Sequence, residues 1–158
     1  MGREVRRVPA DWQHPKNEYD RYKPMFDEPF EPAMRKWIAD WEAWERGERP
    51  EYCSDEGRNM KFWEFEGGPP DPQYYRPDWN EADRTHYMMY EDTSEGTPIS
   101  PAFATPEELA RWLADTGASS FGDFTASYEA WLRVANGGYA PSAVYTPGCG
   151  LQSGVEAL

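Results

Sequence analysis

Apolar side chains recur at helical spacing after Thr105, and this is the strongest local pattern in the chain. Thr105 can accept a backbone hydrogen bond just before a helix, Pro106 suits the first helical position, and Glu108 completes a capping box. The pattern predicts a helix over residues 106–115. Its buried stripe would consist of Leu109, Trp112 and Leu113.

A second stripe, rich in tryptophan, predicts a helix over residues 32–46 that is closed by Gly47. Such a stripe could pack into a core, or it could serve as a platform for a partner or a ligand. A core position is favoured, because a wide apolar stripe left in water promotes association. The stripe consists of Met34, Trp37, Ile38, Trp41 and Trp44.

Alternation of a different kind marks residues 85–90, THYMMY, which are β-branched, aromatic and methionine-rich. Neither face of this predicted strand is polar, so we expect a central strand that is covered on both sides. Residues 3–8 favour an edge strand whose charges protect the open edge. A third helix is predicted over residues 125–135. A hairpin is predicted from residues 143–145 and 151–155.

These elements predict an α+β fold with a small antiparallel or mixed sheet, about three helices and long irregular segments rich in Pro and Gly. The 158 residues are enough for one domain with its own core. We therefore expect a single domain over residues 1–158. The irregular, aromatic-rich segment 9–31 would pack onto it, since a free linker would hold fewer aromatic rings.

Composition adds a strong negative charge to this picture. The formal net charge is −13, which argues against direct binding of nucleic acid or of an anionic membrane surface, because phosphate contacts need basic side chains. The charge suits a partner that has a basic surface. No apolar run approaches the roughly 20 residues that a membrane span requires, and no signal-peptide core is apparent.

Carboxylates cluster in the turn that follows the predicted central strand. This turn could be a solvated loop, a docking surface for a basic partner, a metal cluster or an acid–base pair. Its candidate residues are Glu91, Asp92 and Glu95. The tryptophan-rich helix carries a second acidic group, Asp40, Glu42 and Glu45, that could contact a basic groove.

Other reactive residues are few and scattered. Arg3, Arg6 and Arg7 could contact phosphate, but pairing with the chain's own carboxylates is favoured by the overall charge. Cys53 and Cys149 are consistent with free thiols in a reducing compartment. No known catalytic, nucleotide-binding or metal-binding motif occurs, so we assign no catalytic residue, no metal ligand and no cofactor. His14 and His86 are the only histidines.

The stretches VRRVPADWQHP, YEDTSEGTPISPAFATPEELARWLAD and SGVEAL resemble a group of small acidic proteins of tailed bacteriophages and prophages. This family has no assigned activity, so no residue role can be transferred from it. The resemblance implies an accessory protein that acts in the cytoplasm of an infected bacterial host. It covers both ends and the middle of the chain, and is weakest over residues 33–77.

Accessory phage proteins often bind a host factor, and small acidic ones include inhibitors of CRISPR and restriction systems. The resulting hypothesis is a protein that binds a basic host protein through its acidic surface. One alternative is an enzyme that acts on a nucleotide or small molecule near the EGTPIS turn. Another is a virion assembly protein. The sequence leaves the oligomeric state, the strand order and the partner open.

Overall fold

The computed structural model describes residues 1–93 and 95–157. Their contacts form two compact units: unit 1 contains residues 1–25 and the residues from 79 onward, and unit 2 contains residues 26–78. Helices and antiparallel strands occur together, which confirms the predicted α+β class. The expectation of a single domain stays a prediction.

The main sheet of unit 1 has the strand order β5-β4-β1-β6, and all neighbouring strands are antiparallel. β1 (Gly2–Val8) pairs along its length with β4 (His86–Glu91), while β5 (Thr97–Pro98) and β6 (Tyr139–Pro141) are short flanking strands. The predicted edge position of residues 3–8 is therefore wrong for Arg3 and Glu4. β1 is an inner strand along its first half, where β6 pairs with Gly2, Arg3 and Glu4 on the side opposite β4.

β4 is an inner strand with apolar residues on both faces, as predicted. Met89 belongs to the core formed with two helices, whereas Met88 and Tyr90 belong to a smaller cluster with Val8. Trp12 and Trp79 pack against this second cluster. Side chains alternate between the faces of a strand, so one strand anchors both clusters.

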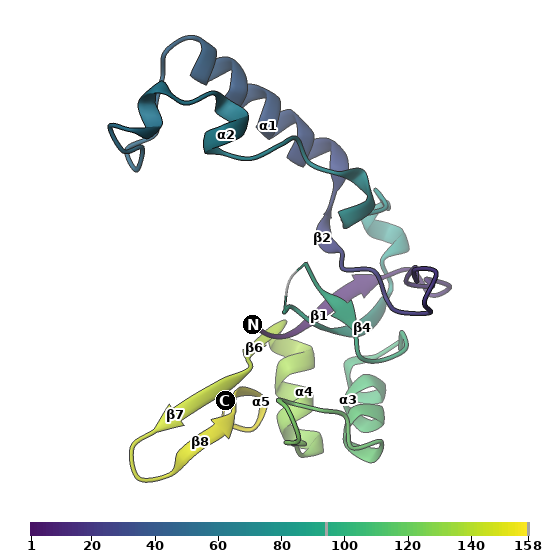
Figure 1. Ribbon diagram of the computed structural model, residues 1–158. Coiled ribbons are helices and arrows are strands. Elements are labelled where there is room, and N and C mark those ends of the chain that lie inside the picture. Colours follow the sequence, from purple (N-terminus) through teal and green to yellow (C-terminus); the bar gives the residue numbers. More distant parts are fainter. Residues whose placement is uncertain (94, 158) are drawn as a thin grey trace. The chain divides into compact units, whose positions relative to one another are not determined.

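The helices of the main core are α3 (Pro106–Asp115) and α4 (Tyr128–Gly137), which pack side by side against the sheet (Figure 1). α3 has the predicted bounds, and the Thr105 side chain accepts a hydrogen bond from the Glu108 backbone N at 3.2 Å. α4 starts later than predicted, because Ser127 caps it by accepting a hydrogen bond from the Ala130 N.

The C-terminal part of unit 1 contains the predicted hairpin. β7 (Ala143–Thr146) pairs with β8 (Gly150–Ser153), and a single-turn helix, α5 (Gly154–Ala157), follows. Val155 was expected in the second strand, but it lies in α5 and is buried in the main core. Among the described residues, no helix has the length and apolar character that a membrane crossing requires.

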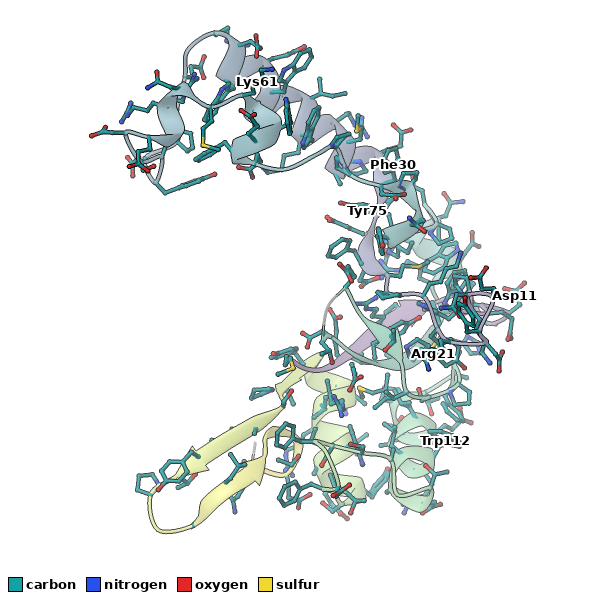
Figure 2. The ribbon with its side chains drawn as sticks, in the orientation of Figure 1. Asp11, Arg21, Phe30, Lys61, Tyr75 and Trp112 are labelled. Atoms are coloured by element: carbon teal, nitrogen blue, oxygen red, sulfur yellow. The ribbon has the colours of Figure 1, made fainter. Side chains whose placement is uncertain are left out.

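Unit 2 is built around α1 (Phe30–Glu45), which begins two residues before the predicted start. Pro32 lies in its first turn, where a backbone N–H has no helical acceptor. The small core joins Trp44 to Cys53 and to Phe62 of α2 (Phe62–Phe65). Short parallel pairing connects β2 (Phe26–Pro29) and β3 (Tyr75–Arg76), and the rings of Phe30 and Tyr75 lie 5.8 Å apart (Figure 2).

Candidate partner-binding surface

The six acidic residues predicted from the sequence belong to different units. Glu91 is the last residue of β4 in unit 1, and Asp92 and Glu95 follow it. Asp40, Glu42 and Glu45 lie on α1 in unit 2. Each unit therefore holds one of the two groups, and the surroundings of the groups differ.

In unit 1 the carboxylate of Glu91 pairs with a buried arginine. The Arg3 Nη1 lies 3.1 Å from Glu91 Oε2, and the Arg3 Nε donates to the Ser119 carbonyl at 3.0 Å. Arg3 and Glu91 also face each other in the β1–β4 register. A buried guanidinium needs such partners, because its charge is costly to remove from water. Glu91 thus serves the fold. Asp92 lies 3.7 Å from the terminal ammonium of Met1.

The second buried arginine of β1, Arg6, is held by the same turn. Its Nε donates to the Glu4 carboxylate at 2.9 Å, and its Nη2 donates to the Glu95 backbone carbonyl at 2.9 Å. Gly96 has φ +111°, and a Cβ there would lie 2.2 Å from the Arg6 Nη2. Only glycine tolerates both this backbone and this close approach. The preference of Arg3 and Arg6 for the chain's own carboxylates is confirmed.

On α1 the tryptophan stripe divides into a covered edge and an exposed edge. Trp44 is 5% exposed and packs on Phe62 and Phe65, whereas Trp41 is 43% exposed. The core position predicted for the whole stripe is therefore wrong for its exposed edge. Unit 2 is too small to cover both edges, since its other elements are single turns and short strands.

The exposed edge carries two carboxylates beside its apolar side chains. Ile38 and Glu42 are four residues apart, and so are Trp41 and Glu45, so these side chains are neighbours along the helix surface. All four are exposed. We call this surface the α1 face and define it as Ile38, Trp41, Glu42 and Glu45.

Asp40 lies on the opposite flank of α1 and has a partner of its own. Its carboxylate accepts a hydrogen bond from the Lys36 Nζ at 2.5 Å. This hydrogen bond, together with the negative charge of Asp40, raises the pKa of Lys36. Two shallow grooves border this pair, one next to Trp44 and one next to Trp37. Asp40 is consequently outside the α1 face.

Negative charge is denser in unit 2 than in unit 1. Residues 26–78 carry 14 carboxylates and seven basic side chains, a formal charge of −7. The other 105 residues carry 15 carboxylates and nine basic side chains, a formal charge of −6. The α1 face therefore lies on the more acidic of the two units, which strengthens attraction of a cationic partner.

Unit 1 contains a groove of about 670 Å³ that sequence reasoning missed. Trp12, His14 and Tyr22 of the N-terminal segment face Ser100 and Trp112 across it, and Trp112 is labelled in Figure 2. Residues that are distant in sequence form this groove, so no local sequence pattern predicts it. The Ser100 Oγ donates to the Pro101 carbonyl and accepts from the Met89 N. These two hydrogen bonds satisfy the buried hydroxyl group.

His14 lies at the buried side of this groove and is bonded at both ring nitrogens. Its Nε2 is 2.6 Å from the Lys23 carbonyl, and its Nδ1 is 3.1 Å from the Tyr90 Oη. A carbonyl can only accept, so Nε2 carries the proton that is donated to Lys23. Burial lowers the pKa of His14, and Arg6 adds to this effect, while the bond to Lys23 opposes it.

Either metal ligation or similarity to a known protein would indicate a chemistry for these sites. Within residues 1–93 and 95–157, no group of three or more His, Cys, Asp or Glu side chains is arranged to hold a metal ion. Cys53 is buried and Cys149 is exposed, and both are free thiols. Comparisons with protein-family models, with curated proteins and with solved structures found no match.

Proposed function

We propose that this protein is a binding protein that holds a partner with a basic surface through the α1 face. The observation that carries the proposal is the exposure of Trp41 and Ile38 beside the carboxylates of Glu42 and Glu45. Tryptophan is enriched at the energetic centres of protein interfaces, and its exposure in an isolated protein is unfavourable.

The chemistry of the α1 face suits arginine and lysine side chains. An indole ring attracts a cation to its face, the two carboxylates accept its hydrogen bonds, and Ile38 packs against the aliphatic stem. The chain uses the same contact internally: the Arg49 guanidinium lies 3.8 Å from the ring centre of Trp44, and Arg111 lies 3.8 Å from that of Tyr128.

The charge of unit 2 should make association with a basic partner fast and dependent on salt. Unit 2 has a formal charge of −7, so it attracts a basic surface at long range when salt is low. Ionic screening shortens this attraction to about 8 Å at physiological salt. Association should therefore slow as salt increases, while the contacts of Trp41 and Ile38 should persist.

The resemblance to phage and prophage proteins gives the proposal a setting. We propose a host protein in the infected bacterial cytoplasm as the partner, and a bacterial defence system such as CRISPR or restriction as the process that binding inhibits. Proteins of these systems hold nucleic acid in basic grooves, because phosphate contacts require basic side chains. An acidic protein can occupy such a groove without binding nucleic acid itself.

The test is affinity purification of the tagged full-length protein from infected bacteria, after nuclease treatment, with mass spectrometry. The surface variant combines Trp41→Ala with Glu42→Gln and Glu45→Gln. The matched control combines Tyr19→Ala with Glu18→Gln and Glu129→Gln, which removes the same net charge and an exposed aromatic ring from unit 1. We expect one bacterial protein to be retained by the wild type and the control, and lost by the surface variant.

Binding of the purified partner then decides the proposal. The surface variant should raise the dissociation constant at least about 30-fold, roughly 2 kcal/mol. The same variant should fail to protect phage in a plaque assay on hosts that carry the defence system. A partner that binds both variants equally would overturn the α1 face as the site. Sedimentation of the protein with virions would favour the assembly role instead.

A further inference from the structure

A run of 22 residues near the C-terminus, 134–155, contains no Asp, Glu, Lys, Arg or His. Charged residues make up 28% of the chain, and the next longest run without one, 96–106, has 11 residues. The long run includes the hairpin formed by β7 and β8. The hairpin is therefore an uncharged element of a strongly acidic protein.

The hairpin is a two-stranded sheet with exposed apolar side chains. Figure 1 shows it extending beyond α5, and within the part of the chain that the structure describes no third strand pairs with β7 or β8. Tyr145 and Leu151 are direct cross-strand partners, so both project from the same face. Tyr145 is 71% exposed, and Leu151 is also exposed.

An exposed hairpin edge without charges is unusual, because proteins protect open edges from other strands with charged residues or proline. A two-stranded sheet is also only marginally stable in water. The β7 side is flanked by Pro141 and Pro147, whereas no proline occurs from Gly148 to Val155. The edge of β8 is thus the one left open to pairing.

We propose that β8 of one copy pairs antiparallel with β8 of a second copy, so that two hairpins form one four-stranded sheet. Two copies carry −13 each and repel through most of their surfaces. The neutral hairpin is where two such chains approach with the least repulsion. A two-fold axis through Leu151 makes the interface self-complementary, as in most homodimers.

This symmetry also explains the exposed apolar pair. Antiparallel pairing about an axis perpendicular to the sheet places the same face of both hairpins on one side. Leu151 of each copy then becomes the cross-strand neighbour of the other, and the two Tyr145 rings extend the apolar row outward. Strands of four residues give a small interface, so we expect a dissociation constant on the order of 100 µM.

The test is sedimentation equilibrium of the full chain over a range of concentrations, with a reducing agent to prevent disulfides through the exposed Cys149. We expect a monomer–dimer equilibrium. Leu151→Lys and Tyr145→Lys should each raise the dissociation constant at least tenfold. The matched control, Tyr19→Lys, changes a tyrosine that is 74% exposed in the same unit and should leave it unchanged. Circular dichroism checks that each variant is folded.

Salt separates this contact from binding at the α1 face. Screening weakens the repulsion between two acidic chains, so added salt should strengthen dimerisation, whereas it should weaken capture of a basic partner. A chain that stays monomeric up to about 1 mM overturns the proposal. A dimer that persists in both hairpin variants overturns it as well, and dissociation by the Trp41 variant would assign self-association to the α1 face.

Discussion

Carboxylates of unit 1 and unit 2 have different surroundings. In unit 1 two arginines of the inner strand β1 are buried, and the carboxylates of Glu4 and Glu91 are turned toward them. In unit 2 the carboxylates of Glu42 and Glu45 are exposed on a helix beside the half-exposed ring of Trp41. The acidic turn of unit 1 stabilises a fold, and the acidic helix of unit 2 presents a surface.

The difference shows why a local cluster of carboxylates is a poor indicator of a binding site. Glu91 and Glu42 both occur among other acidic residues. The neighbouring strand β1 places Arg3 beside Glu91, whereas Glu42 is exposed on α1. An acidic residue becomes available to a partner only where the fold supplies no cation of its own. Substitutions in each unit should therefore have different consequences.

The largest expected effect separates two tryptophans of the same helix. Trp44→Ala should lower the free energy of unfolding of unit 2 by about 4 kcal/mol, because it empties a site packed against Phe62 and Phe65. Trp41→Ala should change it by less than about 1 kcal/mol. Urea denaturation followed by circular dichroism measures both. Equal losses would mean that Trp41 is a core residue and not an interface residue.

A smaller effect is expected from the buried arginines of unit 1. Arg6→Met should lower the free energy of unfolding by about 3 kcal/mol, because Glu4 and two backbone carbonyls lose their donor. Arg7 is exposed over the ring of Tyr87, and Arg7→Met should cost less than about 1 kcal/mol. If the two variants unfold at the same urea concentration, the internal role assigned to Arg6 is wrong.

The smallest effect concerns pH. Burial lowers the pKa of His14, so the folded protein binds fewer protons at this site than the unfolded chain, whose histidine has the ordinary value of 6.5. The contribution is present above that value and is lost as the pH falls below it. Stability measured at about pH 7.5 and about pH 5.5 should fall less in His14→Gln than in the wild type.

His86→Gln is the control for this measurement, because His86 lies on β4 outside the His14 network and its Nδ1 is bonded to the Thr85 hydroxyl. His14→Gln and the wild type share every other titratable group, so the difference between their pH dependences reports on His14 alone. If the free energy of unfolding depends on pH identically in His14→Gln and in the wild type, the lowered pKa of His14 is contradicted.

Part of the candidate site was predictable. The spacing of Ile38, Trp41, Glu42 and Glu45 follows from helix periodicity, and the sequence places all four on one helix. Which edge of the stripe is covered depends on Cys53 and Phe62, which approach from other elements. Periodicity defines a stripe, but it contains no information on how much of that stripe the rest of a small unit can cover.

The sequence by itself determined the elements whose causes are local. The helix that begins after Thr105, the inner strand through Met89 and the hairpin turn at Pro147 all depend on neighbouring residues, and their propensities and caps act over a few positions. Only the tertiary structure decided that β1 is an inner strand, that Arg3 pairs with Glu91, and that Trp41 remains exposed. These outcomes depend on contacts between residues far apart in the chain, where packing and burial of charge outweigh local preference.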